Sequence, residues 1–242
     1  MNELKDIIRK ILIFLRLDLT QNLKYDRLTQ IIMKRSLNED SNCIDVGCHK
    51  GEILDLMLKF SPKGQHFAFE PLPHLYKNLV STYSKKATIF PFALSTEAGQ
   101  TTFQFVKNAP AYSGIKNRRY DVAKPEIEEI HVEMNTIDAL IPKEQRIDFV
   151  KIDVEGGELG VMKGGLQLLK QNQPTIIFEC GKGASDFYGT SAEDLFSLIT
   201  EEIGLKLYTL RGFVDHKASL TYSQFQHFFN SNEEYYFIAS KE

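Results

Sequence analysis

The stretch Cys43-Ile-Asp-Val-Gly-Cys-His-Lys-Gly51 decides the fold of this chain. Apolar residues lead into Asp45, Gly47 and Gly51 bracket a turn, and from Ile53 the apolar residues follow helical spacing. The pattern predicts a strand, a glycine turn and a helix. Gly47 can adopt backbone angles closed to other residues, and Gly51 leaves room for a ligand and for close helix packing. Such a turn is typical of a nucleotide-binding site.

The spacing of the glycines indicates which nucleotide binds. Dinucleotide sites have three glycines in the pattern G-x-G-x-x-G, whose backbone N–H groups hold a pyrophosphate. This chain has two glycines, and Asp45 stands two residues before the first of them. A carboxylate there repels a phosphate and attracts an ammonium or sulfonium group. The expected cofactor is therefore S-adenosylmethionine, which carries both groups.

Two side chains lie inside the glycine turn. Cys48 is interpreted as a small apolar filler of the pocket rather than a nucleophile. His49 either contacts the carboxylate end of the cofactor or is an exposed turn residue, and the sequence leaves both open.

A second acid follows at a spacing that suits a ribose. The run from Gln65 to Pro71 predicts a short apolar strand that ends at Glu70, 19 residues after Gly51. Nucleotide-binding folds place a carboxylate near this position, where it accepts hydrogen bonds from both ribose hydroxyls. Glu70 is therefore the expected ribose ligand. The alternative is a plain tight turn, with Asp45 and Glu70 solvated at strand ends.

Composition limits the class of protein. A chain of 242 residues, 43% hydrophobic and 25% charged, suffices for one α/β unit with a complete core. The net charge of -3 and the pI near 6.1 give no field that would gather a polyanion, so a small-molecule partner is favoured over nucleic acid. Three cysteines cannot all pair and lack zinc-ribbon spacing, which indicates reduced thiols and a cytoplasmic location.

The first 40 residues predict a helical cap on a nucleotide-binding domain of residues 41–242. One helix has an apolar face from Leu4 to Leu15, and a second runs from Tyr25 to about Leu37. The most apolar run is too short to span a bilayer, and no cleavage signal follows it. The first helix needs a cover, which is the domain's own pocket or a second subunit in a homodimer; a membrane surface is less favoured.

Beyond residue 40, strands and helices alternate. This order predicts a parallel sheet with right-handed crossovers and helices on both faces. The seven expected strands are residues 44–46, 67–69, 88–93, 147–152, 174–178, 206–210 and 235–239, and the main helices are residues 53–60, 75–83, 158–169 and 192–203.

An insertion at about residues 100–135 interrupts the alternation. Residues 101–106 and 127–134 alternate as strands do, and the polar loop from Asn108 to Lys124 joins them. Such a loop can hang over the cofactor edge of the sheet. Lys116, Arg118 and Arg119 could meet an acidic acceptor there, although a solvated charge run is the favoured interpretation.

A second acidic motif, Lys151-Ile-Asp-Val-Glu-Gly-Gly-Glu158, closes the fourth strand. Ligands of open α/β sheets bind beyond the carboxyl ends of strands, so Asp153 and Glu155 should face the same crevice as Asp45, Glu70 and Glu179. Either Asp153 or Glu155 could take a proton from an acceptor hydroxyl.

Two other uses of these acids remain open. Glu158 could serve the start of the following helix, where negative charge is favourable. A divalent metal on Asp153, Glu155 or Glu179 is possible because oxygen ligands suit magnesium or calcium. It is not favoured, since the acids lack the spacing of a coordinating loop.

Five motifs occur in a fixed order. They are Asp45-Val-Gly-x-x-x-Gly51, Phe69-Glu70-Pro71, Ala93-Leu94-Ser95, Thr136-Ile-Asp138 and Lys151-Ile-Asp-Val-Glu-Gly156. With them, residues 42–180 resemble the FkbM family of S-adenosylmethionine-dependent methyltransferases. The resemblance implies a class I methyltransferase fold, Rossmann-like, with a seven-stranded sheet whose last strand is antiparallel. It also implies methyl transfer to a hydroxyl of a sugar or secondary metabolite.

The resemblance further implies a role for each matching residue. Asp45, Gly47 and Gly51 would hold the methionine part of the cofactor. Glu70, followed by Pro71, would hold the ribose. Ala93 and Leu94 would lie at the adenine, and Asp153 and Glu155 near the reacting methyl group.

Two other classes of function are weighed against this one. An NAD-type oxidoreductase is disfavoured by the missing third glycine. A non-catalytic cofactor-binding protein of the same fold is disfavoured because Asp45 and Glu70 are both present. The leading hypothesis is a small-molecule O-methyltransferase.

Overall fold

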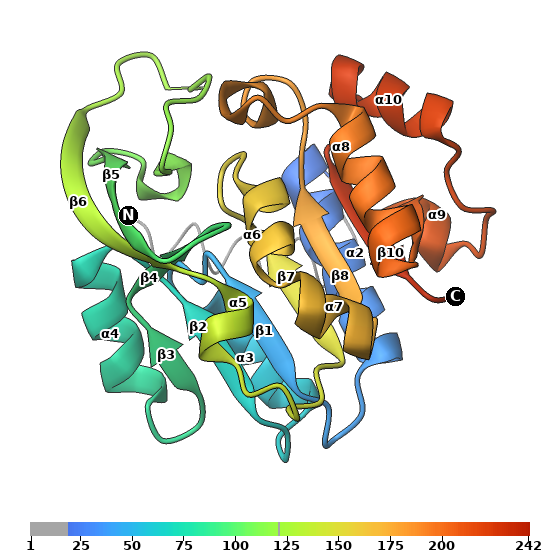
Figure 1. The fold of residues 1–242 in the computed structure, drawn as a ribbon, viewed down its shortest axis with the longest axis horizontal. Coiled ribbons are helices and arrows are strands. Elements are labelled where there is room, and N and C mark those ends of the chain that lie inside the picture. Colours follow the sequence, from blue (N-terminus) through green and yellow to red (C-terminus); the bar gives the residue numbers. More distant parts are fainter. Residues whose placement is uncertain (1–18, 121) are drawn as a thin grey trace.

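A seven-stranded sheet forms the centre of the computed structural model, which describes residues 19–120 and 122–242 (Figure 1). Within these residues the strand order is β3-β2-β1-β7-β8-β10-β9. The strands are β1 (Cys43–Val46), β2 (His66–Phe69), β3 (Thr88–Phe90), β7 (Phe149–Ile152), β8 (Thr175–Glu179), β9 (Lys206–Thr209) and β10 (Tyr236–Ser240). Only β10 runs antiparallel to its neighbours. The predicted mostly parallel sheet with an antiparallel last strand is confirmed.

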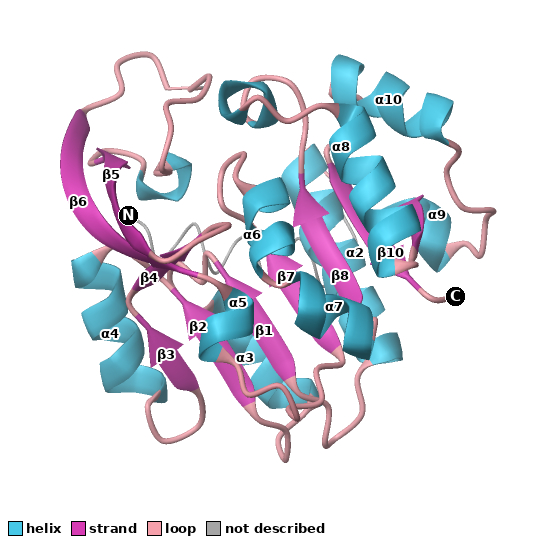
Figure 2. Ribbon diagram, viewed as in Figure 1, coloured by secondary structure: helices cyan, strands magenta, loops and turns pink. Residues whose placement is uncertain are grey.

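Helices cover both faces of this sheet, as predicted (Figure 2). On one face lie α2 (Gln21–Ser36), α3 (Glu52–Phe60), α4 (Pro73–Tyr83) and α9 (Leu210–Val214). On the other lie α5 (Ile137–Leu140), α6 (Glu158–Gly164), α7 (Leu166–Asn172), α8 (Ala192–Ser197) and α10 (Tyr222–Ser231). The described residues also form the short helical segments η1 (Pro110–Tyr112), η2 (Ser185–Tyr188) and η3 (Leu198–Ile203). The central strands are therefore buried on both sides.

Helix α2 corresponds to the second predicted N-terminal helix. Thr20 caps its start by accepting a hydrogen bond from the Leu23 amide at 3.2 Å. Leu28 and Ile32 are fully buried and pack in the same apolar cluster as Phe149 of the central strand β7. The helix therefore forms part of the main core. The first predicted helix, and the homodimer contact suggested for it, lie outside the described residues.

The expected strand at residues 88–93 is wrong as a single element. Pro91 divides it into β3 and β4 (Phe92–Leu94), because proline has no N–H to continue the hydrogen-bonded ladder. Strand β4 belongs to a second sheet of order β4-β6-β5, with β5 (Gly99–Val106) and β6 (Ile127–Asn135). As predicted, β5 and β6 pair antiparallel.

The expected helix at residues 158–169 is also divided. It breaks between α6 and α7 at Gly164 and Gly165, two residues that favour helix poorly. A Cβ atom on Gly164 would lie 2.0 Å from the carbonyl oxygen of Ser95, so the helix touches the backbone after β4 at this point. In the part of the chain that the structure describes, no helix has both the length and the apolar character needed to cross a membrane.

We predict that Ile32→Ala lowers the free energy of unfolding by about 2–5 kcal/mol, because a fully buried side chain in the α2 contact is lost. Ile127→Ala is the matched control. Its side chain is 41% exposed, so the cost should stay below about 1 kcal/mol. Urea denaturation of both variants measures the difference, and equal costs would show that α2 is not part of the core.

Candidate functional site

A cavity of about 1210 Å³ lies at the carboxyl ends of the parallel strands. Its walls come from the turns that follow β1, β2, β7 and β8, from β4, and from the loop between β5 and β6. The five carboxylates predicted to share one crevice all line it: Asp45, Glu70, Asp153, Glu155 and Glu179. Pockets for a single small ligand commonly measure roughly 300–1,000 Å³. The cavity therefore has room for a nucleotide cofactor and a second small molecule.

The turn after β1 depends on Gly47. Its φ angle is +78°, and a Cβ atom there would lie 1.9 Å from the carbonyl oxygen of Asp153. Gly51, at φ +87°, has a different role from the one expected, because it caps α3 and does not line the cavity. A Cβ atom on Gly51 would meet the ring of Tyr83 at 2.7 Å. Its missing side chain thus makes room for Tyr83 rather than for a ligand.

Asp45 carries an unmatched acceptor. Its side chain is 2% exposed, and one of its oxygens, Oδ2, has no hydrogen-bond partner. Burial raises the pKa of this carboxyl to about 6, although a hydrogen bond with Cys48 and the charge of Lys151 act in the opposite direction. A buried acceptor without a donor is costly, so this wall of the cavity suits a ligand that donates hydrogen bonds and carries positive charge.

Glu70 joins the turns after β1 and β2. Its carboxylate accepts hydrogen bonds from the amides of His49 at 2.8 Å and Leu72 at 2.9 Å. Burial raises its pKa to about 7, while these two bonds lower it. Each oxygen accepts one bond and keeps capacity for another.

The remaining predicted cofactor residues also line the cavity. Cys48 is 5% exposed, and burial raises the pKa of its thiol far above the usual range, in keeping with the filler interpretation. His49 is half-buried, and burial lowers its pKa, so the neutral ring faces the cavity. Pro71, Ala93 and Leu94 add a mostly apolar wall.

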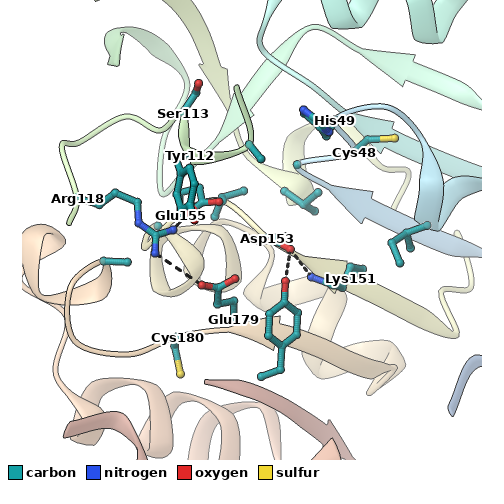
Figure 3. A pocket seen from close by; sticks show the side chains of 18 of the residues that line it. Cys48, His49, Tyr112, Ser113, Arg118, Lys151, Asp153, Glu155, Glu179 and Cys180 are labelled. Atoms are coloured by element: carbon teal, nitrogen blue, oxygen red, sulfur yellow. Dashed lines mark hydrogen bonds and ion pairs between the residues drawn. The ribbon is translucent and has the colours of Figure 1, made fainter. Parts of the chain in front are cut away.

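Asp153 is held by two partners that sequence reasoning did not connect to it (Figure 3). Its Oδ2 lies 2.9 Å from Nζ of the buried Lys151 and accepts a 2.5 Å hydrogen bond from the hydroxyl of Tyr236. Lys151 Nζ also lies 4.6 Å from the centre of the Tyr236 ring. Burial would raise the pKa of Asp153, but Lys151 and Tyr236 together hold it below its usual value. This carboxylate is a weak proton acceptor, which argues against the expected role of Asp153 as the base.

Glu155 and Glu179 share a mostly buried arginine from the insertion. Glu155 forms an ion pair with Arg118, whose guanidinium also lies 3.8 Å from Glu179 and 5.3 Å from the centre of the Tyr112 ring (Figure 3). The side chain of Arg118 is only 13% exposed. The favoured interpretation of a solvated charge run is therefore wrong for Arg118. Burial and the charge of Asp153 raise the pKa of Glu179 to about 8, although Arg118 lowers it.

Glu158 lies in the first turn of α6, and its carboxylate binds backbone amides there. This is one of the two uses left open for the acidic motif. Glu158 accepts hydrogen bonds from the amides of Val154 at 3.2 Å and Gly156 at 3.1 Å. It is buried and does not line the cavity. Among residues 19–120 and 122–242, no three histidine, cysteine or acidic side chains are grouped as a metal site requires.

The sequence matches a known family over most of its length. The sequence model of the Methyltransferase FkbM domain covers residues 45–207. This chain belongs to the FkbM methyltransferase family.

Solved structures of methyltransferases resemble this FkbM-family chain. Methyltransferase FkbM from Methylobacillus flagellatus KT is 13% identical, with a TM-score of 0.52, over 84% of this chain and 44% of that chain. This chain thus spans less than half of that protein. A precorrin-6y C5,15-methyltransferase from Geobacter metallireducens GS-15 is 12% identical, with a TM-score of 0.45, over 90% of this chain and 88% of the other. The comparison with curated proteins finds no match.

We predict that Gly47→Ala lowers the free energy of unfolding by at least about 2 kcal/mol, since it adds a clash to an unfavourable backbone angle. Gly99→Ala is the control. It has no atom within 4 Å of the added carbon and should change stability by less than about 0.5 kcal/mol. Chemical denaturation compares the two, and a tolerated Gly47→Ala would disprove the close approach to Asp153.

We also predict that the empty protein loses stability as the pH rises from 7 to 8.5. The pKa values of Glu70 and Glu158 are raised to about 7 and that of Glu179 to about 8, whereas unfolded glutamates titrate near 4.3. The folded state therefore binds more protons than the unfolded state, and its stability falls as these groups ionise. His49 and His66, whose pKa is lowered, act in the opposite direction, chiefly below pH 6.5.

Denaturation at several pH values checks this dependence. Glu179→Gln removes the group with the highest of these pKa values and should flatten the curve between pH 7 and 8.5. A wild-type curve that is level or rises in this range would contradict the prediction.

Proposed function

We propose that this FkbM-family protein binds S-adenosylmethionine in the cavity and transfers its methyl group to a hydroxyl of a small molecule, a sugar or a secondary metabolite. One observation carries the proposal. The buried, unpartnered oxygen of Asp45 lies in β1, just before the turn that requires Gly47, and Asp45 lines the cavity with six other acids. A ligand with ammonium and sulfonium groups supplies the donor and the positive charge that this wall lacks.

The proposed cofactor site follows the cavity wall from the first turn to the second sheet. Asp45, Gly47, Cys48 and His49 would surround the methionine part. Gly51 would act only by shaping the turn, because it does not line the cavity.

The rest of the cofactor would lie along the next two walls. Glu70 would accept hydrogen bonds from the ribose hydroxyls through the capacity left on its two oxygens, beside Pro71. The buried Ala93 and Leu94 offer an apolar surface for the adenine.

The chain's own part in methyl transfer is alignment and proton removal. When bound, S-adenosylmethionine would supply a methyl group that its sulfonium already activates, so positioning provides much of the rate. Asp153, paired with Lys151, and Glu155, paired with Arg118, would attract positive charge to this end of the cavity. Glu179 in its ionised form would take the proton of the acceptor hydroxyl, because its pKa of about 8 makes it a stronger base than Asp153, whose pKa is lowered.

A neutral acceptor fits the charges at this end of the cavity. Arg118 is already paired with two acids and lies over the ring of Tyr112. Tyr112, Tyr188 and Tyr236 all line the cavity. An acidic acceptor would lie near the carboxylates of Asp153 and Glu179, which would repel it. Arg118 could not neutralise its charge, because Arg118 is already paired with two acids. The net charge of -3 likewise supports a small molecule over nucleic acid.

Thermal melting with S-adenosylhomocysteine and with NAD tests the cofactor. A ligand that binds only the folded state raises the melting temperature, so the first should stabilise the protein and NAD should not. Transfer of a tritiated methyl group to a panel of neutral sugars and phenols tests the acceptor. Stabilisation by NAD alone would sink the proposal.

For the ribose assignment, we predict that Glu70→Gln weakens binding of S-adenosylhomocysteine by about 1–3 kcal/mol, because one strong acceptor for the hydroxyls is lost. Isothermal titration calorimetry measures the change. Glu97→Gln, at an exposed position outside the cavity, should bind as the wild type does. Unchanged affinity in Glu70→Gln would refute the assignment.

A further inference from the structure

Residues 115–119 form a strap that runs from the small sheet to the large sheet. The strap begins beside Gly114, which exchanges two hydrogen bonds with Gln104 of β5 at 2.8 and 3.3 Å. Gly114 also lies close to Glu155, since a Cβ atom there would be 3.4 Å from that of Glu155. The start of the strap is therefore fixed to the second sheet and against the cavity wall.

The far end of the strap is bound to the loops that follow β8. The amide of Lys116 donates to the hydroxyl of Tyr188 at 3.1 Å, and the amide of Arg119 donates to the carbonyl of Gly183 at 2.7 Å. Between them, Arg118 pairs with Glu155 and Glu179 inside the cavity (Figure 3). The strap thus closes the carboxylate end of the cavity from the side of the insertion.

Polar contacts, rather than apolar burial, hold the strap in place. Ile115 is its one apolar residue and is half-buried, whereas Lys116, Asn117 and Arg119 are exposed. Segments with little buried apolar surface open locally at low cost compared with global unfolding. The ion pairs of Arg118 are therefore a restraint that reaches from the strap to two acids of the cavity.

We propose that residues 115–119 act as a gate over the end of the cavity that holds Glu155 and Glu179. The ion pairs of Arg118 with these two acids keep the gate closed. Opening separates Arg118 from both acids and lets a small molecule reach Glu179. Closing returns Arg118 to them and excludes water from the reacting groups. The identity of the small molecule that enters rests on the proposed function. The opening and closing of residues 115–119 do not.

Two cysteines provide a test that needs no acceptor. Cys180 lines the cavity at the start of the loop whose Gly183 carbonyl the strap binds, and its side chain is 2% exposed and packs in one core cluster. Cys43 is fully buried in the other core cluster, away from the cavity. Iodoacetamide at pH 8, with peptide mass spectrometry, measures how fast each thiol is modified. We expect Arg118→Gln to speed modification of Cys180 at least about tenfold and to leave Cys43 protected.

Matched variants separate the gate from general loosening. Lys107→Gln removes an exposed ion pair with Glu128 in the same insertion and should leave both rates unchanged. Arg118→Lys keeps the charge and should restore part of the protection of Cys180. The gate is overturned if Cys180 reacts equally fast in Arg118→Gln and wild type, or if Cys43 is accelerated as much as Cys180 in both Arg118 variants.

The proposed function and the gate fail in different ways. If S-adenosylhomocysteine does not bind while Arg118→Gln exposes Cys180, the cofactor assignment is wrong and the gate stands. If the ligand binds the wild type and Cys180 stays protected in Arg118→Gln, the function stands and the gate is wrong.

Discussion

The close approach of the chain at Gly47 to the backbone of Asp153 is the constraint on which the site depends. At this point the turn after β1 lies against the end of β7, and a side chain would not fit. The Asp153 amide donates to the Val46 carbonyl, and the Gly47 amide donates to the Phe69 carbonyl, both at 3.0 Å. Backbone bonds thus unite the turns after three neighbouring strands. The acids of these turns share one cavity because their main chains already touch.

Charge is the second feature that unites the site. Seven acidic residues line the cavity, whereas the cations largely withdrawn from solvent there, among the described residues, are Lys151 and Arg118, each already paired with an acid. Raised pKa values of Asp45, Glu70 and Glu179 follow from this imbalance together with burial. The empty cavity therefore holds protons that a positively charged ligand would displace.

The local sequence pattern predicted most of the fold. The site was predicted less completely, because several of its contacts join residues that are far apart in the sequence. Alternation and the glycine turn predicted the large sheet, while the effect of Pro91 on the third strand was overlooked although proline is a readable signal. Tyr236 reaches Asp153 across 83 residues of sequence, and no local motif marks that contact. Arg118 was interpreted as solvated because its two acidic partners, in the turn after β7 and at the end of β8, are distant from it in the sequence.

Strand β10 has a consequence for the order in which the molecule assembles. It lies between β8 and β9 and pairs with both, so β9 has no place in the large sheet until β10 has been inserted. Since β9 precedes β10 in the sequence, it can join the large sheet only together with the segment that follows it. The same segment brings Tyr236 to Asp153. The placing of β10 therefore completes the edge of the large sheet and brings Tyr236 to the cavity at the same time.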